Sequence, residues 1–460
     1  MNSKLRAWLL FLIFLNGYVS LSLELIVIRQ LSFYVGSSAV ISGIIIGIFL
    51  GFMSLGYFYG GSNKIRKSHV RNILSNSFLT IALMYVLAGS FTLVTVYFTL
   101  MYGYGIQSII TQTFIYSALF LSVAPFLFGF NTALMSKYLN RNNGNYTGKI
   151  MAWGTIGSVL GSLASTLLLM PLIGVNYTIM LGALLSASAA IMVKPKLKVI
   201  IISAAILIPT YIINCNTFLL KQHKMLVNSE ISTILITDDG ERKWMVMDGI
   251  TMSIFNKKDR TSAEYMNYIN DNFIYSMPRD KKRNILILGA GGFTAGLNDN
   301  FHNYTFVDIE KALKDVTEKQ FLMEPLTPNK TFVAQDAMPF LKNAIQKYDL
   351  ILLDVYSNSY QIPEGFITVE FMERIKSRVA DGGIILMNVI GSTNFSDDYS
   401  RVFDNTFHSV FKSNTQRQVI GYANPWEKNS EANIIYIYYD RPSPQRVYTI
   451  NKTPVIYDVK

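Results

Sequence analysis

Long apolar runs separated by short polar loops fill the first half of the chain. Each run is about 20 residues or longer, which is the length that a helix needs to cross the hydrocarbon core of a bilayer. The seven runs cover residues 7–28, 39–60, 75–99, 107–134, 150–172, 175–193 and 199–219. This pattern predicts a multi-span α-helical membrane domain of about seven spans over residues 1–225.

The hydrophobic pattern becomes shorter and strand-like after residue 225. Two alternating segments, 231–237 and 243–248, flank an Asp-Asp-Gly turn and predict a small β-hairpin lid. A helix is expected over 262–273, so that the lid and its connecting helix together cover residues 226–282.

Apolar strands alternate with helical segments over residues 283–445. Strands are expected at 285–288, 305–307, 349–353 and 384–388, and helices at 310–322, 337–346 and 368–379. This alternation predicts a parallel, doubly wound, Rossmann-like α/β domain that binds a nucleoside. Further strands near 418–422 and 433–439 would complete the sheet, antiparallel at its edge, before a tail over 446–460.

The charges divide the chain at the same place. Residues 1–229 contain fifteen Lys and Arg but a single acid, whereas residues 230–460 contain 26 basic and 29 acidic residues. The basic residues of the first half form clusters within 64–71, 137–149 and 194–198, as in cytoplasmic loops of a membrane protein. The net charge of +11 therefore indicates a lipid bilayer as partner and excludes a nucleic-acid-binding protein.

The positive-inside rule places the N-terminus in the cytoplasm and the chain in the inner cell membrane. Seven spans would then place the second half outside, although Lys221 and Lys224 after the last run favour the inside. A domain that uses a cytosolic nucleoside must lie inside. The sequence leaves the side of the soluble domain open.

Glu24 is the single carboxylate among the apolar runs, and Arg29 follows it by five residues. A charge near hydrocarbon is costly unless it is paired or faces a cavity, which indicates a functional site. A structural ion pair between the two residues, or with a neighbouring helix, explains the pattern equally well. Close helix packing is expected at the glycines of the second and fifth runs, which are Gly43, Gly47, Gly51, Gly56, Gly154, Gly157 and Gly161.

The candidate chemistry of the second half lies at the expected carboxyl ends of strands, where such sheets bind ligands. Gly289 and Gly291 lie in a turn after the first strand, where a ligand can approach the backbone. Asp308 lies where a carboxylate would accept from ribose hydroxyls, and Asp336 can accept from an adenine amine. Asp354 lies at the centre of the sheet, where a reacting group is expected. Acids at these positions are also common as helix caps.

These motifs resemble the spermidine synthase family of polyamine aminopropyltransferases over residues 228–440. The matching segments in this sequence are Met-Asp-Gly at 247–249, Tyr265, Leu-Gly-Ala-Gly-Gly at 288–292, Val-Asp-Ile-Glu at 307–310, Gln-Asp-Ala at 335–337 and Tyr-Asp-Leu-Ile-Leu-Leu-Asp at 348–354. The apolar half resembles the multi-span block that is fused to such domains in some bacterial proteins.

The resemblance implies transfer of an aminopropyl group from decarboxylated S-adenosylmethionine, or a related reaction of S-adenosylmethionine, to a small amine or polyamine. Asp354 would then act on the attacking amine with help from Tyr265, Asp308 would bind ribose and Asp336 would bind adenine. No metal is expected, because the histidines show no ligand spacing. The chain is also compatible with a homodimer.

The sequence departs from the family at three positions, because Gly292 and Ser357 replace acids and Met252 replaces a glutamine. Two alternatives therefore stay open. One is an S-adenosylmethionine-dependent methyltransferase, which shares the fold. The other is a non-catalytic domain that senses a nucleoside or polyamine and gates a membrane transporter, with Glu24 in its pathway.

Overall fold

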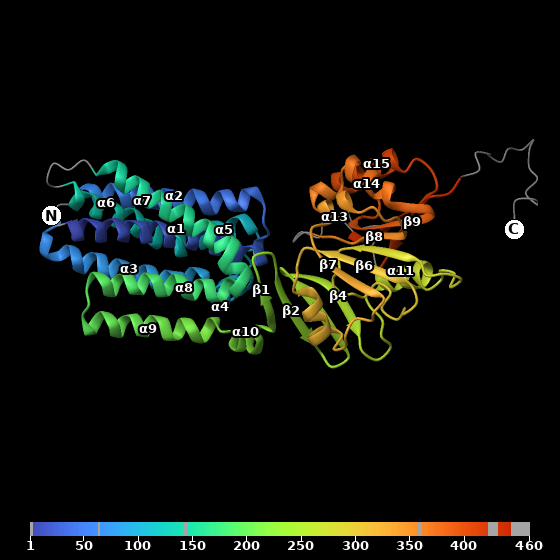
Figure 1. Cartoon of the computed structure of the whole chain (residues 1–460), viewed down its shortest axis with the longest axis horizontal. Coiled ribbons are helices and arrows are strands. Elements are labelled where there is room, and N and C mark those ends of the chain that lie inside the picture. The colour runs from blue at the N-terminus through green and yellow to red at the C-terminus, as the bar shows by residue number, and fades with distance from the viewer. Residues whose placement is uncertain (1–2, 63–64, 141–145, 357–360, 422–430, 443–460) are drawn as a thin grey trace, which may run out of the picture. The chain divides into compact units, whose positions relative to one another are not determined.

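The computed structural model describes residues 3–62, 65–140, 146–356, 361–421 and 431–442 (Figure 1). The chain forms two compact units, Met1–Met252 and Ser253–Lys460. Ser357 and the expected tail over 446–460 lie outside the described residues.

The first unit contains the apolar helices, several of which run alongside one another (Figure 1). They are α1 (Ser3–Val35), α2 (Ala39–Ser62), α3 (Lys67–Gly89), α4 (Phe91–Gly103), α5 (Ile109–Phe120), α6 (Val123–Leu139), α7 (Thr147–Ala164), α8 (Met170–Val193), α9 (Leu197–Asn214) and α10 (Asn216–His223). A short π-helical segment, Ser165–Leu169, joins α7 to α8.

Several predicted runs are broken helices. The third run divides at Ser90 into α3 and α4, because the Ser90 backbone is extended, with ψ of 126°. The fourth run divides into α5 and α6, which are bent by 43°. The predicted boundary between the fifth and sixth runs coincides with Gly174, whose φ of 81° and ψ of 165° interrupt α8.

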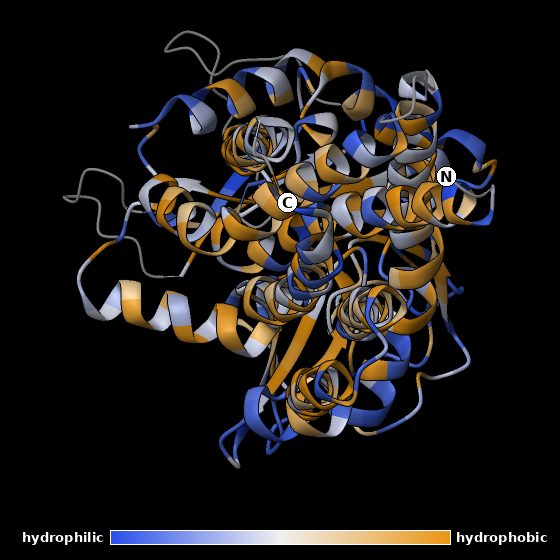
Figure 2. Ribbon diagram, turned by 90° about the vertical axis from the view of Figure 1, so that its left-hand side faces the viewer, coloured by the Kyte–Doolittle hydropathy of each residue, from blue (hydrophilic) through white to orange (hydrophobic). Residues whose placement is uncertain are grey.

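Among the described residues, five helices are long and apolar enough to cross a membrane, or six if the bent pair is one span. One of the five is the stretch Thr147–Val193, within which Gly174 is non-helical. The helices seen end-on carry mostly hydrophobic residues (Figure 2). Large apolar side chains of this unit are exposed, among them Phe58, Leu167 and Leu172. These features are compatible with membrane insertion, and the predicted number of spans stays a prediction.

Glycines bring α1 close to α7. A Cβ atom on Gly157 would lie 2.0 Å from the carbonyl oxygen of Phe14, and one on Gly161 would lie 2.2 Å from that of Tyr18. Gly56 of α2 is equally close to Phe126 of α6. The predicted close packing is therefore confirmed at these three glycines. It is wrong for Gly43, Gly47 and Gly51, where an added Cβ would meet no atom of the described residues within 4 Å.

Four strands follow α10 and form an antiparallel sheet in the order β1-β2-β3-β4. They are β1 (Met225–Asn228), β2 (Thr233–Asp238), β3 (Arg242–Met247) and β4 (Ile250–Asn256). β2 and β3 flank the Asp-Asp-Gly turn, which confirms the predicted hairpin. The boundary between the two compact units falls within β4.

The second unit is an α/β domain with a mixed sheet in the order β10-β11-β9-β8-β5-β6-β7. Its strands are β5 (Asn284–Leu288), β6 (Asn303–Asp308), β7 (Lys330–Ala334), β8 (Tyr348–Leu353), β9 (Val379–Ser392), β10 (Thr415–Ile420) and β11 (Glu431–Tyr439). The strands from β7 to β9 are parallel, whereas β11 pairs antiparallel both with β9 and with the edge strand β10. β11 is therefore the strand that runs in the opposite direction, and the edge pair β10–β11 is antiparallel. The predicted Rossmann-like sheet with an antiparallel edge is therefore confirmed.

The predicted helices of this domain are shorter in the structure, and one further helix, over Asp398–Val410, was not predicted. They are α11 (Glu264–Ile269), α12 (Leu313–Val316), α13 (Ala337–Asn343), α14 (Val369–Arg378) and α15 (Asp398–Val410), with π-helical segments after α11 and α12 and a 3₁₀ turn over Glu364–Phe366. α13, α14 and α15 share an apolar core with the sheet, and Figure 1 shows them together. β5 has β6 on one side and β8 on the other, so the order of strands reverses at its carboxyl end. Ligands of such sheets bind at this switch point.

Replacement of Gly157 with alanine is expected to lower the stability of the helical unit, because the new methyl group would collide with the Phe14 carbonyl. Such overpacking costs about 1–3 kcal/mol. Thermal unfolding of the detergent-purified protein measures the effect. The matched control is Gly47→Ala, which adds a methyl group in open space and should leave the midpoint unchanged or raise it. Equal midpoints for both variants would contradict the packing.

Candidate active site

The turn after β5 brings two strand ends together at the switch point. Gly289 has a φ of 95°, and its N–H donates to the carbonyl of Val307 over 2.9 Å. A Cβ atom at this position would lie 2.2 Å from the carbonyl oxygen of Asp354. Gly291 also has a positive φ, of 47°. Only glycine allows the close approach at position 289, so the turn and the end of β8 lie side by side.

Asp308 ends β6 and faces the same turn. Its Oδ2 accepts from the N–H of Ala290 over 2.9 Å, and its Oδ1 accepts from the N–H of Glu310 over 3.0 Å. Desolvation raises the pKa of Asp308, and these amide donors oppose the shift. The carboxylate thus bridges the glycine turn and the loop after β6, and each oxygen retains a lone pair for a ligand.

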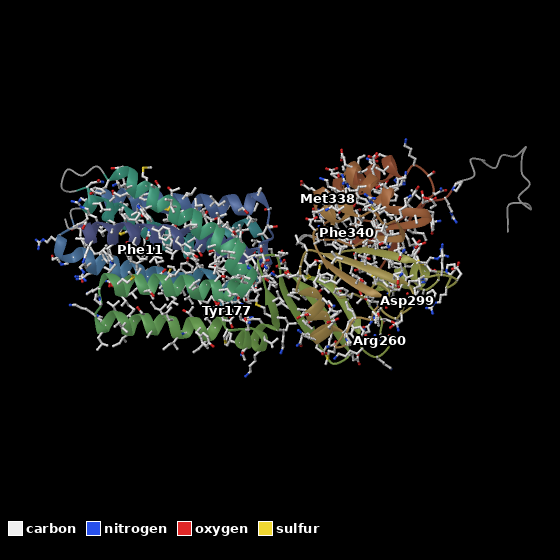
Figure 3. The ribbon with its side chains drawn as sticks, viewed as in Figure 1. Phe11, Tyr177, Arg260, Asp299, Met338 and Phe340 are labelled. Atoms are coloured by element: carbon white, nitrogen blue, oxygen red, sulfur yellow. The ribbon has the colours of Figure 1, made fainter. Side chains whose placement is uncertain are left out.

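Asp336 lies after β7 and caps α13, because its Oδ1 accepts from the N–H of Met338 over 2.7 Å. This contact agrees with the helix-cap reading of the sequence. The predicted contact with adenine is untested. Met338 and Phe340, which Figure 3 labels, follow in α13, and the side chain of Met338 is 37% exposed. Ile309, after β6, is 51% exposed.

Asp354 follows β8 and is held by two donors. The hydroxyl of Tyr265, from α11, donates to Oδ2 over 3.0 Å, and the amide of Asn388, from β9, donates to Oδ1 over 2.9 Å. Tyr356 in turn donates to the backbone carbonyl of Asn388 over 2.8 Å. Desolvation raises the pKa of Asp354, whereas the bonds from Asn388 and Tyr265 lower it. Desolvation also raises the pKa of Tyr265, which keeps its hydroxyl a donor.

Gly292 ends the turn at a position where the resembled family has an acid. Its N–H donates to the hydroxyl of Ser253, in β4, over 2.8 Å. A Cβ atom on Gly292 would lie 2.3 Å from Cε1 of the fully buried Phe321. An aromatic ring therefore occupies the space into which an acidic side chain would extend.

The structure therefore brings Gly289, Asp308 and Asp354 together, and it adds Tyr265 to Asp354, as expected from the sequence. Sequence reasoning missed Asn388 and Ser253. Asn388 is a polar residue within the apolar strand β9, which is a detectable signal. Ser253 carries no comparable signal. Within the described ranges, no three His, Cys, Asp or Glu residues are grouped as metal ligands.

Known proteins match this chain in the region that contains the candidate site. The spermine/spermidine synthase domain matches residues 270–421. The polyamine aminopropyltransferase of Vibrio vulnificus (strain CMCP6) is 30% identical over 155 residues, which cover 32% of this chain and 50% of that protein. Polyamine aminopropyltransferase 2 of Aquifex aeolicus (strain VF5) is 22% identical over 403 residues, which cover 81% of this chain and 77% of that protein.

A crystal structure of a probable spermidine synthase from Corynebacterium glutamicum ATCC 13032 is similar, with a TM-score of 0.39 and 20% sequence identity. The similarity covers 48% of this chain and 80% of that one. The present chain spans only half the length of the Vibrio vulnificus relative. The family model identifies residues 270–421 as a spermine/spermidine synthase domain, and the curated relatives that match this chain are polyamine aminopropyltransferases.

Proposed function

We propose that this chain is a membrane-integrated aminopropyltransferase that uses decarboxylated S-adenosylmethionine as donor and a small amine as acceptor. The observation that carries the proposal is Asp354, held by Tyr265 and Asn388 directly beside the glycine turn. A carboxylate at a switch point, next to a turn that a nucleoside can approach, suits a reaction between a nucleoside sulfonium and a nucleophile.

The donor would occupy the edge formed by the ends of β5, β6 and β7. Asp308 would accept from the ribose hydroxyls with the lone pairs that its two amide contacts leave unused. Ile309 and Met338 offer exposed apolar side chains next to this edge, against which a purine can stack. Asp336 would accept from the adenine amine while it continues to cap α13.

The reaction would be an in-line displacement at the carbon beside the sulfonium. The amine nitrogen forms the new C–N bond, the C–S bond breaks, and methylthioadenosine leaves with the electron pair. The amine must also lose a proton, for which Asp354 is the acceptor. Desolvation strengthens Asp354 as a base by raising its pKa, and Tyr265 and Asn388 keep its two oxygens oriented.

Replacement of Asp354 with asparagine removes this base and keeps the size of the side chain. We expect the release of methylthioadenosine to fall by about 10²–10⁴-fold, while binding of methylthioadenosine stays within a few-fold of wild type. The complementary variant, Asp308→Ala, should lose methylthioadenosine binding.

Chromatography of the products from a panel of monoamines and diamines measures methylthioadenosine release, and calorimetric titration measures methylthioadenosine binding. Release of S-adenosylhomocysteine from S-adenosylmethionine would instead show a methyltransferase, and no product with any amine would contradict an enzyme.

Replacement of Tyr265 with phenylalanine removes one donor to the Asp354 carboxylate. Because that bond lowers the pKa of Asp354, its loss should raise the pKa further. A base is active when deprotonated, so the acid limb of the kcat/KM profile should move to higher pH. Profiles with one amine compare the two proteins, since the titration of the amine is then common to both. An acid limb at the same pH, or at lower pH, would contradict the role of Asp354 as base.

The proposed donor is made in the cytosol, so the active site must face it. We expect a reporter fused after Lys460 to report a cytoplasmic location, with a reporter at the N-terminus as the reference. Two reporters make the measurement: a phosphatase that is active only outside the cytoplasm, and a fluorescent protein that is active only inside it. An external location would exclude an S-adenosyl donor and would favour the sensing alternative.

A further inference from the structure

Arg29, near the end of α1, is buried, and its hydrogen bonds reach the hairpin that follows the helices. Its side chain is 9% exposed. Nε donates to the carbonyl of Ser229 over 2.8 Å, and Nη2 donates to the hydroxyl of Thr233 over 3.1 Å. Both partners lie about two hundred residues further along the chain but within the same compact unit. A guanidinium desolvated in this way is stable only while its partners stay in place.

Asp248 is the acid that pairs with Arg29. Nη1 of Arg29 lies 3.5 Å from Oδ1 of Asp248, and the same oxygen accepts from the N–H of Thr233 over 3.0 Å. Asp248 lies in the turn between β3 and β4 and has a φ of 46°, which a non-glycine residue adopts rarely. The carboxylate therefore joins α1, β2 and a strained turn.

A second polar contact lies beside the first. The amide of Asn228, at the end of β1, donates to Oε1 of Gln30 over 2.9 Å and to Oδ1 of Asn176 over 2.8 Å. Gln30 is 1% exposed and donates to the carbonyl of Gly89, where α3 ends. The hydroxyl of Thr233 donates to Oδ1 of Asn228 over 3.1 Å. β1 and β2 are thus hydrogen-bonded to α1, α8 and the end of α3, either directly or through Asn228 and Gln30.

Apolar side chains also pack where the first strands meet the helices. Leu219 and Met225 form a buried cluster with Phe91, against which Phe33 and Leu235 pack. Gly249, with a φ of 83°, is so close to α1 that an added Cβ would lie 2.7 Å from the carbonyl of Phe33. The hairpin is consequently part of the helical unit, which extends to Met252.

β4, which begins two residues after Asp248, contains a residue that contacts the glycine turn. Ser253 follows Asp248 by five residues in the chain, and its hydroxyl accepts from the N–H of Gly292 at the end of the glycine turn. A short piece of β-strand, at most about 3.4 Å per residue, therefore separates the ion pair of α1 from a residue that supports this turn.

We propose that Arg29 and Asp248 are positioning residues for the transferase, and that the helical bundle holds the hairpin in the conformation in which Ser253 supports the glycine turn. This inference rests on the proposed function of that turn as the donor site. The helical half is then a working part of the enzyme, and a change at the end of α1 changes donor affinity.

The test compares Arg29→Met, Arg29→Lys and Asp248→Asn in the full-length protein. We expect Arg29→Met to weaken methylthioadenosine binding and raise the donor KM by about tenfold, with little change in kcat. Arg29→Lys should recover part of the loss, because lysine keeps the charge but not the forked donors. The effects of Arg29→Met and Asp248→Asn should be less than additive in the double variant.

Arg71→Met is the control for the loss of an arginine from the helical unit, at an exposed position. Arg71 belongs to the same unit and its Nε also donates to a carbonyl, that of Val193, over 2.9 Å. It has no described contact with the hairpin, so donor affinity should stay unchanged. Thermal midpoints report general destabilisation separately, and Asp248→Asn carries the test if Arg29→Met does not fold.

Hydrogen exchange separates this inference from the proposed function. In the ligand-free protein, residues 225–249 and the amide of Gly292 should exchange faster in Arg29→Met than in Arg71→Met. If the wild-type protein binds no methylthioadenosine, the proposed function fails but the exchange result still tests the coupling. Unchanged exchange at Gly292, or unchanged donor affinity with a loosened hairpin, would overturn the inference.

Discussion

The close contact between the turn after β5 and the end of β8 is the constraint on which the site depends. Gly289 lies where any side chain would strike the Asp354 carbonyl, and the N–H of Asp354 donates to the carbonyl of Leu288 over 2.8 Å. Asp308 extends the same contact, because it accepts from the N–H of Ala290. Backbone geometry thus holds the carboxylate of Asp308 and the end of β8, which Asp354 follows, at one edge of the sheet.

Desolvation and hydrogen bonding have opposite effects on the pKa of Asp354, the carboxylate at the centre of the sheet. Desolvation favours the protonated form of Asp354, and the donors from Tyr265 and Asn388 favour the ionised form. Desolvation is the larger of the two effects, so the pKa of Asp354 stays above its ordinary value. At Gly292 the protein has replaced a carboxylate position with aromatic packing against Phe321.

The helical half contains specific close contacts and a buried charge as well as long apolar helices. Its glycines allow α1 and α7 to touch, and the end of α1 carries the buried cation that the hairpin surrounds. Burying Arg29 without Asp248 and its carbonyl partners would be strongly unfavourable. The bundle and the hairpin are consequently expected to form or loosen together, which gives a physical reason for a fused chain.

Local patterns were sufficient to predict the α/β sheet, the hairpin and the acids at strand ends, because strand alternation and glycine turns are properties of neighbouring residues. They placed Asp308 and Asp354 at one edge, since parallel strands end together. The same patterns could not show where the apolar runs break, as at Ser90, because length and hydropathy do not record a bend.

The sequence by itself thus determined that an apolar helical part precedes an α/β part, and it identified the glycine turn and the acids at the strand ends. Only the tertiary structure decided which distant residues meet. Asn388 reaches Asp354 from another strand, and Arg29 pairs with Asp248 although Glu24 is much nearer in sequence. The physical reason is that a buried charge or amide takes its partner from whatever the folded backbone brings within hydrogen-bonding distance, and sequence separation does not measure that distance.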